Sequence, residues 1–128
     1  MAVVKTLRIG IAPPSYVRER MMSIARGERP DPREPRVWVS STDALFKILT
    51  DKNMLLLEII RSAQPQSVTE LAQLTKRAVP NVSRTLHSLE RLGIVEMKEL
   101  DDGRKAPHLL WDGDKVELDF ESAKPRAA

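Results

Sequence analysis

The side chains best suited to chemistry gather on one face of a helix expected near the middle of the chain. At about 100° per residue, Val82, Leu86 and Leu89 fall on one side of that helix, and Arg84 and Arg91 fall opposite. The polar side also includes Pro80, Asn81, His87 and Ser88, and Arg77 precedes it in the chain. Arginine, asparagine, serine and histidine hydrogen-bond to base edges and phosphates, so this pattern favours nucleic-acid binding.

A shorter helix is expected directly before this one. Its first residues, Ser67-Val68-Thr69-Glu70, match a capping box. We expect the Ser67 hydroxyl to accept the Glu70 N–H, and the Glu70 carboxylate to accept the Ser67 N–H. The apolar stripe of this helix consists of Val68, Leu71, Ala72 and Leu74.

A turn at about Lys76–Ala78 separates the two helices. The second helix is expected to begin near Pro80, because proline loses no hydrogen bond in a first turn and disfavours a helical Val79. Gly93 supplies a left-handed stop. Two short helices joined by a tight turn predict a helix-turn-helix. The alternative is an ordinary helical hairpin whose charged face is only solvated.

A β-hairpin is expected after the second helix. Residues Ile94–Leu100 and Lys105–Trp111 form its strands, and Asp101–Arg104 forms a tight turn, for which Asp-Gly is a strong signal. This order of elements predicts a winged helix. Arg104 and Lys105 beside the tip are placed to contact phosphate or the minor groove. The two aspartates of the tip oppose a very strong contact, and the turn is their alternative role.

The remaining elements surround this unit. Residues 1–36 are interpreted as an N-terminal strand-helix extension and linker, residues 37–120 as the DNA-binding domain, and residues 121–128 as a disordered tail. In these regions we expect strands at Val3–Ala12 and Val37–Val39. We expect helices at Tyr16–Arg26, opened by Ser15, at Asp43–Leu49, and at Lys52–Ala63, capped by Asp51. After a turn at Asp112–Asp114, a third strand carries Val116, Leu118 and Phe120. The fold class is α+β, mainly α.

Composition and charge exclude several classes of protein. The chain has no cysteine and two isolated histidines, so we expect no metal site. It also lacks a glycine-rich phosphate loop and paired catalytic groups, so we expect no catalytic residues, no cofactor and no enzymatic activity. No apolar run is long enough to span a membrane, and we expect a cytoplasmic protein. Residues 1–40 hold eight Lys/Arg against four Asp/Glu, residues 41–92 seven against five, and residues 93–128 six against nine. A basic front and middle suit a polyanionic partner.

The segment SVTELAQLT…PNVSRTLHSLERLGIVE resembles the core of MarR/ArsR-like winged-helix transcriptional regulators, over about Ser41–Trp111. It is more narrowly similar to small prokaryotic regulators found as antitoxins beside a toxin gene. The resemblance implies double-stranded DNA binding, usually as a homodimer on a pseudo-palindrome. By position it assigns DNA contacts to Arg77, Asn81, Ser83, Arg84, Ser88, Arg104 and Lys105. The turn glycine usual in the family is replaced here by Lys76-Arg77.

We therefore expect a transcriptional regulator, a repressor or an autoregulating antitoxin, and keep a protein-interaction module as the alternative. Arg77, Arg84 and Arg91 favour DNA over an adaptor, which would tend to show an acidic or apolar surface. We expect a homodimer held mainly by the N-terminal region, which offers an apolar strand and a short helix with further apolar side chains. The strand carries Leu7, Ile9 and Ile11, and the helix carries Tyr16, Val17, Met21 and Ile24. That region has two other possible roles, which are to fold back onto its own domain or to cover a toxin partner.

Overall fold

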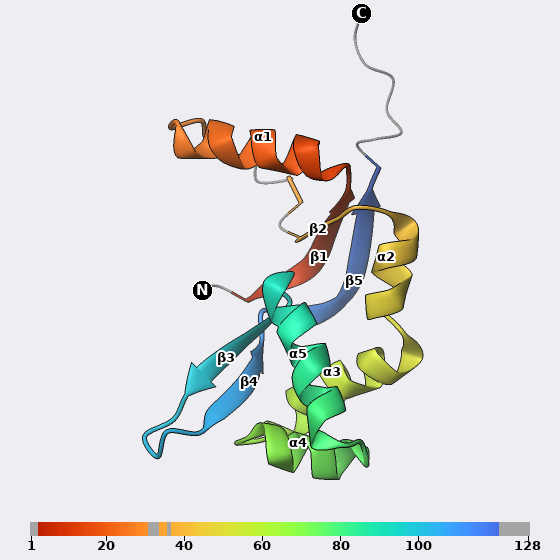
Figure 1. The fold of residues 1–128 in the computed structure, drawn as a ribbon, viewed down its shortest axis with the longest axis vertical. Coiled ribbons are helices and arrows are strands. Elements are labelled where there is room, and N and C mark those ends of the chain that lie inside the picture. Colours follow the sequence, from red (N-terminus) through yellow and green to blue (C-terminus); the bar gives the residue numbers. More distant parts are fainter. Residues whose placement is uncertain (1–2, 31–33, 36, 121–128) are drawn as a thin grey trace, which may run out of the picture.

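The computed structural model describes residues 3–30, 34–35 and 37–120. Within them the chain forms an α+β fold of five strands and five helices, which confirms the expected class (Figure 1). The elements in chain order are β1 (Val4–Ile11), α1 (Pro14–Ala25), β2 (Val37–Val39), α2 (Thr42–Ile48), α3 (Asp51–Ala63), α4 (Val68–Thr75), α5 (Val79–Arg91), β3 (Val95–Glu99), β4 (Lys105–Leu109) and β5 (Trp111–Asp119). The expected tail at residues 121–128 lies outside the described residues.

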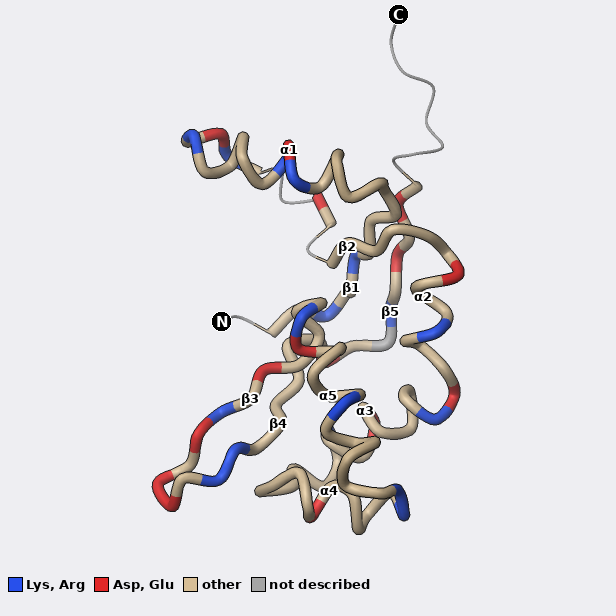
Figure 2. Tube along the Cα trace, in the orientation of Figure 1, with Lys and Arg blue, Asp and Glu red and all other residues tan. Residues whose placement is uncertain are grey.

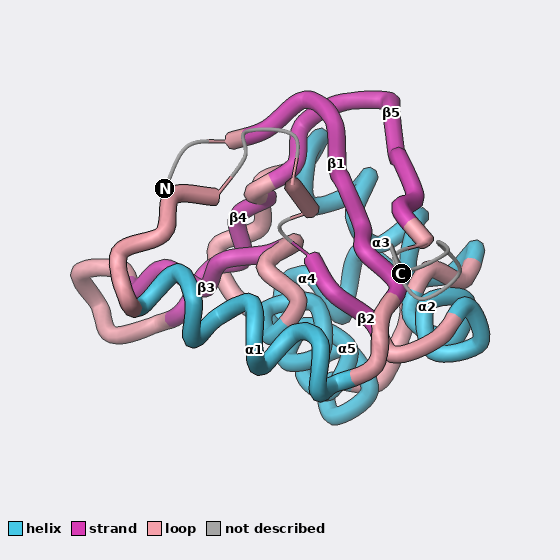
Figure 3. The backbone as a smooth tube through the Cα atoms, turned by 90° about the horizontal axis from the view of Figure 1, so that it is seen from above, coloured by secondary structure: helices cyan, strands magenta, loops and turns pink. Residues whose placement is uncertain are grey.

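The three strands β2, β1 and β5 form a parallel sheet with β1 in the centre. Seen from above, β5, β1 and β2 follow one another across the molecule, with β5 at the margin (Figure 3). Leu7, Ile9 and Ile11 of β1 are buried, and Ile9 is fully inaccessible to solvent. Because both edges of β1 are occupied within the chain, β1 is an integral strand and does not belong to an appended extension.

This position of β1 corrects the basis on which a dimer was expected. The apolar strand that was to pair with a second copy instead folds back into its own chain, which was the competing interpretation. The N-terminal region leaves only α1 largely exposed, and none of the residues of this helix is buried. Homodimer formation stays a prediction, but β1 no longer supports it.

Helix α1 connects the parallel strands β1 and β2 and lies at the opposite end of the sheet from α4 and the hairpin tip (Figure 1). Pro13 precedes its first turn without a side-chain cap, and Ser15 is inside the helix, so the expected Ser15 cap is wrong. Arg20 pairs with Glu34 in the loop that leads to β2, and with Glu28 at 3.2 Å. These ion pairs connect the middle of the helix to the loop that follows it.

An aromatic contact holds the near end of α1 against the sheet. The Tyr16 and Trp38 ring centroids are 5.6 Å apart. The indole of Trp38 lies over Gly10 of β1, where an added Cβ would come within 2.3 Å of the ring. Only glycine at this position leaves room for the indole, so the sheet requires a residue without a side chain there.

A single hydrophobic core joins the sheet to the helices. It contains buried residues of every helix except α1, together with residues of the sheet and of β3. Its fully inaccessible members include Ile9 of β1, Leu45 of α2, Leu56 of α3, Leu71 of α4 and Leu89 of α5. The N-terminal strand and the helical segment therefore stabilise one another, and their stabilities are coupled.

Further local expectations differ from the structure. Helix α3 is capped by Thr50, whose hydroxyl accepts the Asn53 N–H at 3.2 Å, and Asp51 is already helical. The Glu70 carboxylate accepts the N–H of Gln66 at 3.1 Å, one residue earlier than the Ser67 N–H. Asp112–Asp114 belongs to β5, where an irregular register against β1 brings Gly113 against the Lys5 carbonyl. The chain there continues as a strand and makes no turn.

Candidate nucleic-acid interface

A tight turn joins α4 to α5, and backbone conformation and hydrogen bonds describe its geometry. The Ser67 hydroxyl accepts the Glu70 N–H at 3.0 Å and begins α4, as expected. Lys76 ends it in the left-handed conformation with a φ of 56°, the type of position that glycine usually occupies. The Arg77 N–H then donates to the Ala72 carbonyl at 3.1 Å. A lysine thus takes the conformation of the missing glycine, and the turn still forms.

The expected inner face of α5 is confirmed. Val82, Leu86 and Leu89 are buried in the common core. The helix begins at Val79, so the expectation of a non-helical Val79 is wrong, and the extended residue before the helix is Ala78. Gly93 follows the helix with a φ of 79°. The burial of these three residues fixes the rotation of α5 about its axis, and therefore determines which side chains face solvent.

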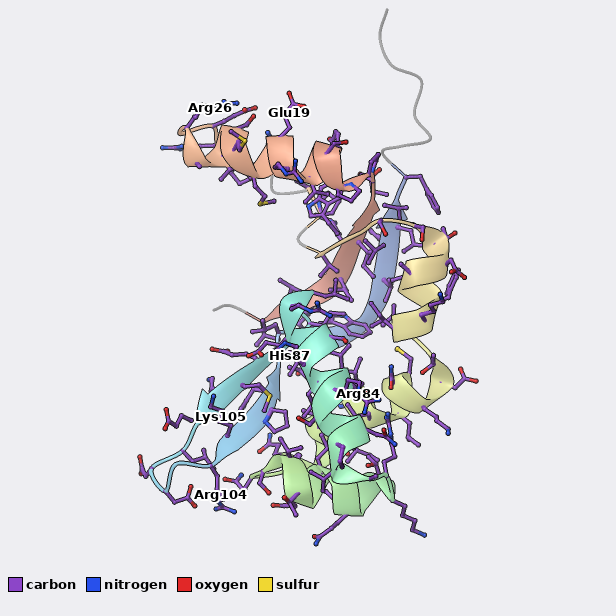
Figure 4. All side chains as sticks on the ribbon, in the orientation of Figure 1. Glu19, Arg26, Arg84, His87, Arg104 and Lys105 are labelled. Atoms are coloured by element: carbon purple, nitrogen blue, oxygen red, sulfur yellow. The ribbon has the colours of Figure 1, made fainter. Side chains whose placement is uncertain are left out.

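The outer face of α5 brings most of the candidate residues together. Those exposed on this helix are Pro80, Asn81, Ser83, Arg84, His87 and Arg91. Arg84 and His87 project from the middle of the helix (Figure 4). Ser88 is half-buried, and its hydroxyl donates to the Arg84 carbonyl at 3.3 Å. Within the part of the chain that the structure describes, no carboxylate lies within ion-pair distance of Arg84 or Arg91.

Arg77 does not join this exposed face. Its guanidinium is turned inward, where one N–H group donates to Asn53 Oδ1 at 3.2 Å and another to Thr85 Oγ1 at 3.1 Å. The side chain is only partly exposed. The structure therefore separates Arg77 from the other basic residues of the helix pair.

The hairpin β3–β4 follows α5 and lies beside it (Figure 1). Its turn has Gly103 at a φ of 85°, as the Asp-Gly signal predicts. Arg104 folds back onto Asp102, donating from Nε to Oδ2 at 2.6 Å and from its backbone N–H to Oδ1 at 3.0 Å. These two donors hold the pKa of Asp102 below its usual range. Lys105 is exposed next to this pair (Figure 4).

The charge along the unit is unevenly distributed. Figure 2 shows basic residues on α5 and acidic residues at the tip of the hairpin. Arg104 is partly neutralised by Asp102, whereas α5 carries exposed Arg84 and Arg91 together with exposed Glu90. Two further exposed lysines, Lys76 in the turn and Lys98 on β3, were missed among the candidate residues. The sequence did contain a signal for Lys76, because a lysine stands at the turn where the family usually has glycine.

Other types of site were sought among residues 3–30, 34–35 and 37–120. No group of three or more His, Asp or Glu residues is placed there to hold a metal ion. None of the helices in the same segments is long and apolar enough to cross a membrane.

The fold and this interface define an α+β protein in which a tightly joined helix pair leads into a β-hairpin. The chain belongs to the HVO_A0114 family, whose model matches residues 48–116. The matched segment contains α3, α4, α5 and the whole hairpin, and it ends within β5. No curated protein and no solved structure matches the chain significantly.

Proposed function

We propose that residues 51–109 form a winged helix-turn-helix that binds double-stranded DNA, and that the protein is a transcriptional regulator. In this assignment α5 enters the major groove and the β3–β4 hairpin is the wing. The supporting observation is the exposed face of α5, where Asn81, Arg84 and Arg91 lie opposite the buried Val82 and Leu86. The resemblance to MarR/ArsR-like regulators supports the same assignment.

The chemistry of this face suits direct reading of DNA. Asparagine pairs in a bidentate manner with adenine, and arginine pairs with guanine or with phosphate. Arg84 and Arg91 lie seven residues apart, which places them two helical turns apart on the same side of α5. Because no described carboxylate neutralises them, both cations remain available to a polyanion.

The test is a titration of labelled duplex DNA from the protein's own upstream region, followed by fluorescence anisotropy. We expect Arg84→Ala to weaken specific binding by roughly 1–3 kcal/mol without unfolding the protein. Arg18→Ala is the matched control, because Arg18 is an exposed arginine of α1, far from α5. Equal losses in both variants, or none in Arg84→Ala, would contradict the assignment.

A second candidate function is self-association through α1. Met21 and Met22 are 47% and 53% exposed on a helix that buries none of its residues. Methionine is a flexible apolar side chain that is common at adaptable interfaces. Light scattering should then show a dimer for the parent protein and a monomer for Met21→Lys/Met22→Lys. A monomeric parent protein would exclude this candidate.

A further inference from the structure

A chain of hydrogen bonds connects α2, α3, the turn and α5. Asn53 of α3 donates from Nδ2 to the Ile48 carbonyl at 2.7 Å, at the end of α2. Its other amide atom, Oδ1, accepts from Arg77 in the turn, and Arg77 also donates to Thr85 in the second turn of α5. Three side chains therefore join α2, α3, the turn after α4 and α5.

The central member of this chain is a cation without a charged partner. Both acceptors of the Arg77 guanidinium, an amide and a hydroxyl, are neutral, and no carboxylate of the described residues pairs with it. A guanidinium is a planar group whose N–H donors point in fixed directions, so it holds two acceptors at a defined separation. A lysine ammonium is a single point donor on a flexible stem and cannot reproduce that spacing.

The position of Thr85 explains why this geometry bears on DNA. Thr85 lies on the flank of α5 between the buried face and the exposed face that includes Arg84. The buried face of α5 fixes its rotation about its own axis through apolar contacts, which are individually non-directional. The bonds from Arg77 add a directional restraint between α3 and α5.

We propose that Arg77 is a positioning residue that sets the orientation of α5 against α3, and acts on DNA recognition through Asn53 and Thr85. This inference rests on the proposed DNA binding, and it replaces the direct contact that the sequence assigned to Arg77. Arg77 supplies geometry, whereas Arg84 and Arg91 supply the contacts to DNA.

The salt dependence of DNA binding distinguishes the two roles. Each phosphate that a cation neutralises adds about one unit to the slope of log Kd against log salt, and a lysine in place of the arginine would retain that unit. A positioning role predicts that Arg77→Lys and Thr85→Val each weaken specific binding, roughly five-fold or more, with an unchanged slope. The double variant should be no weaker than the weaker single variant, because both changes break one network.

A phosphate contact would give a different result: Arg77→Lys would retain its full affinity, and Arg77→Met would have a slope reduced by about one unit. That pair of results would overturn the proposal. Lowered melting temperatures with unchanged specific affinity in Arg77→Lys and Thr85→Val would overturn it in favour of a purely stabilising role.

Hydrogen exchange in the protein without DNA separates this inference from the proposed function. We expect Arg77→Lys and Thr85→Val to raise exchange of the amides of residues 83–86 roughly ten-fold, because the restraint on α5 is removed. Lys76→Gln is the matched control, because it removes the neighbouring cation. The Lys76 side chain makes no hydrogen bond or ion pair with the described residues, so this variant should leave the exchange unchanged. Unchanged exchange in Arg77→Lys would refute the positioning role. A parent protein that binds no duplex, with exchange raised as expected, would refute the DNA function alone.

Discussion

Two arginines of the N-terminal region are paired with carboxylates, whereas the two arginines of α5 are not. Near the N-terminus, Arg20 of α1 is 17% exposed and pairs with Glu34 and Glu28, and Arg8 of β1 pairs with Glu117 of β5 at 3.1 Å. On α5, Arg84 and Arg91 are exposed and have no carboxylate within ion-pair distance among the described residues. The first group connects segments of the chain that are distant in sequence, and the second remains available for an external partner.

This difference indicates that net charge is a poor guide to the location of a binding surface. Residues 1–40 carry the largest excess of basic residues, and two of these, Arg8 and Arg20, are paired with carboxylates of the described residues. Arg18 and Arg26 of α1 are exposed and have no carboxylate within ion-pair distance among the described residues. The middle of the chain has a smaller excess, and two of its seven basic residues, Arg84 and Arg91, lie on α5. The relevant quantity for a polyanion is the number of cations left unpaired on one face.

The largest expected effect concerns the shared core of these two regions. Deleting residues 1–12 removes the central strand of the sheet and the buried Leu7, Ile9 and Ile11. We expect the product to show no cooperative thermal transition, because both remaining strands of the sheet are left without their partner. Calorimetry checks this, with Met22→Ala as a surface control whose stability should change by less than about 0.5 kcal/mol. A truncated protein that melts cooperatively would show that the regions are independent.

Within the helix pair, the next largest effect concerns the inner face of α5. Leu86→Ala should lower the free energy of unfolding by about 2–5 kcal/mol, because Leu86 is 2% exposed in the common core. Val79→Ala at the exposed start of the same helix is the control. Urea denaturation measures both. Equal stabilities of Leu86→Ala and the parent protein would mean that α5 is rotated from the orientation described.

The contrast between paired and unpaired arginines predicts two opposite phenotypes. Arg20→Ala should lower the melting temperature and leave DNA affinity unchanged, since its contacts with Glu34 and Glu28 join α1 to the following loop. Arg84→Ala should lower DNA affinity and leave the melting temperature unchanged. Thermal unfolding and anisotropy on the same samples measure both quantities. The comparison fails if either variant changes both.

The smallest effect is expected at the tip of the hairpin. Replacing Arg104 and Lys105 together by alanine should weaken specific and random duplexes alike and make the slope of log Kd against log salt shallower by roughly one to two units. The pairing of Arg104 with Asp102 favours the lower value, because that cation is already partly neutralised. An unchanged slope and affinity would mean that the hairpin serves the fold only.

Elements governed by local chemistry could be predicted from the sequence. The rotation of α5, the Ser67 cap and the Gly103 turn follow from spacing within a few residues, and all three are as expected. The central place of β1 could not be predicted, because its partner β5 begins about 100 residues later and parallel pairing leaves no short turn signal. The inward side chain of Arg77 was missed for a related reason, since its partner Asn53 lies on another helix.

The most direct test of the central claim is a map of amide chemical shifts during titration with a random duplex at low salt. An operator is not needed, because DNA-binding domains bind non-specific duplexes with a Kd of about 10⁻⁴–10⁻⁶ M even at physiological salt. We predict that the largest shifts fall on residues 79–91 and 101–105, with α1 unaffected. Shifts centred on α1, or none at all, would contradict the assignment of α5 as the recognition helix.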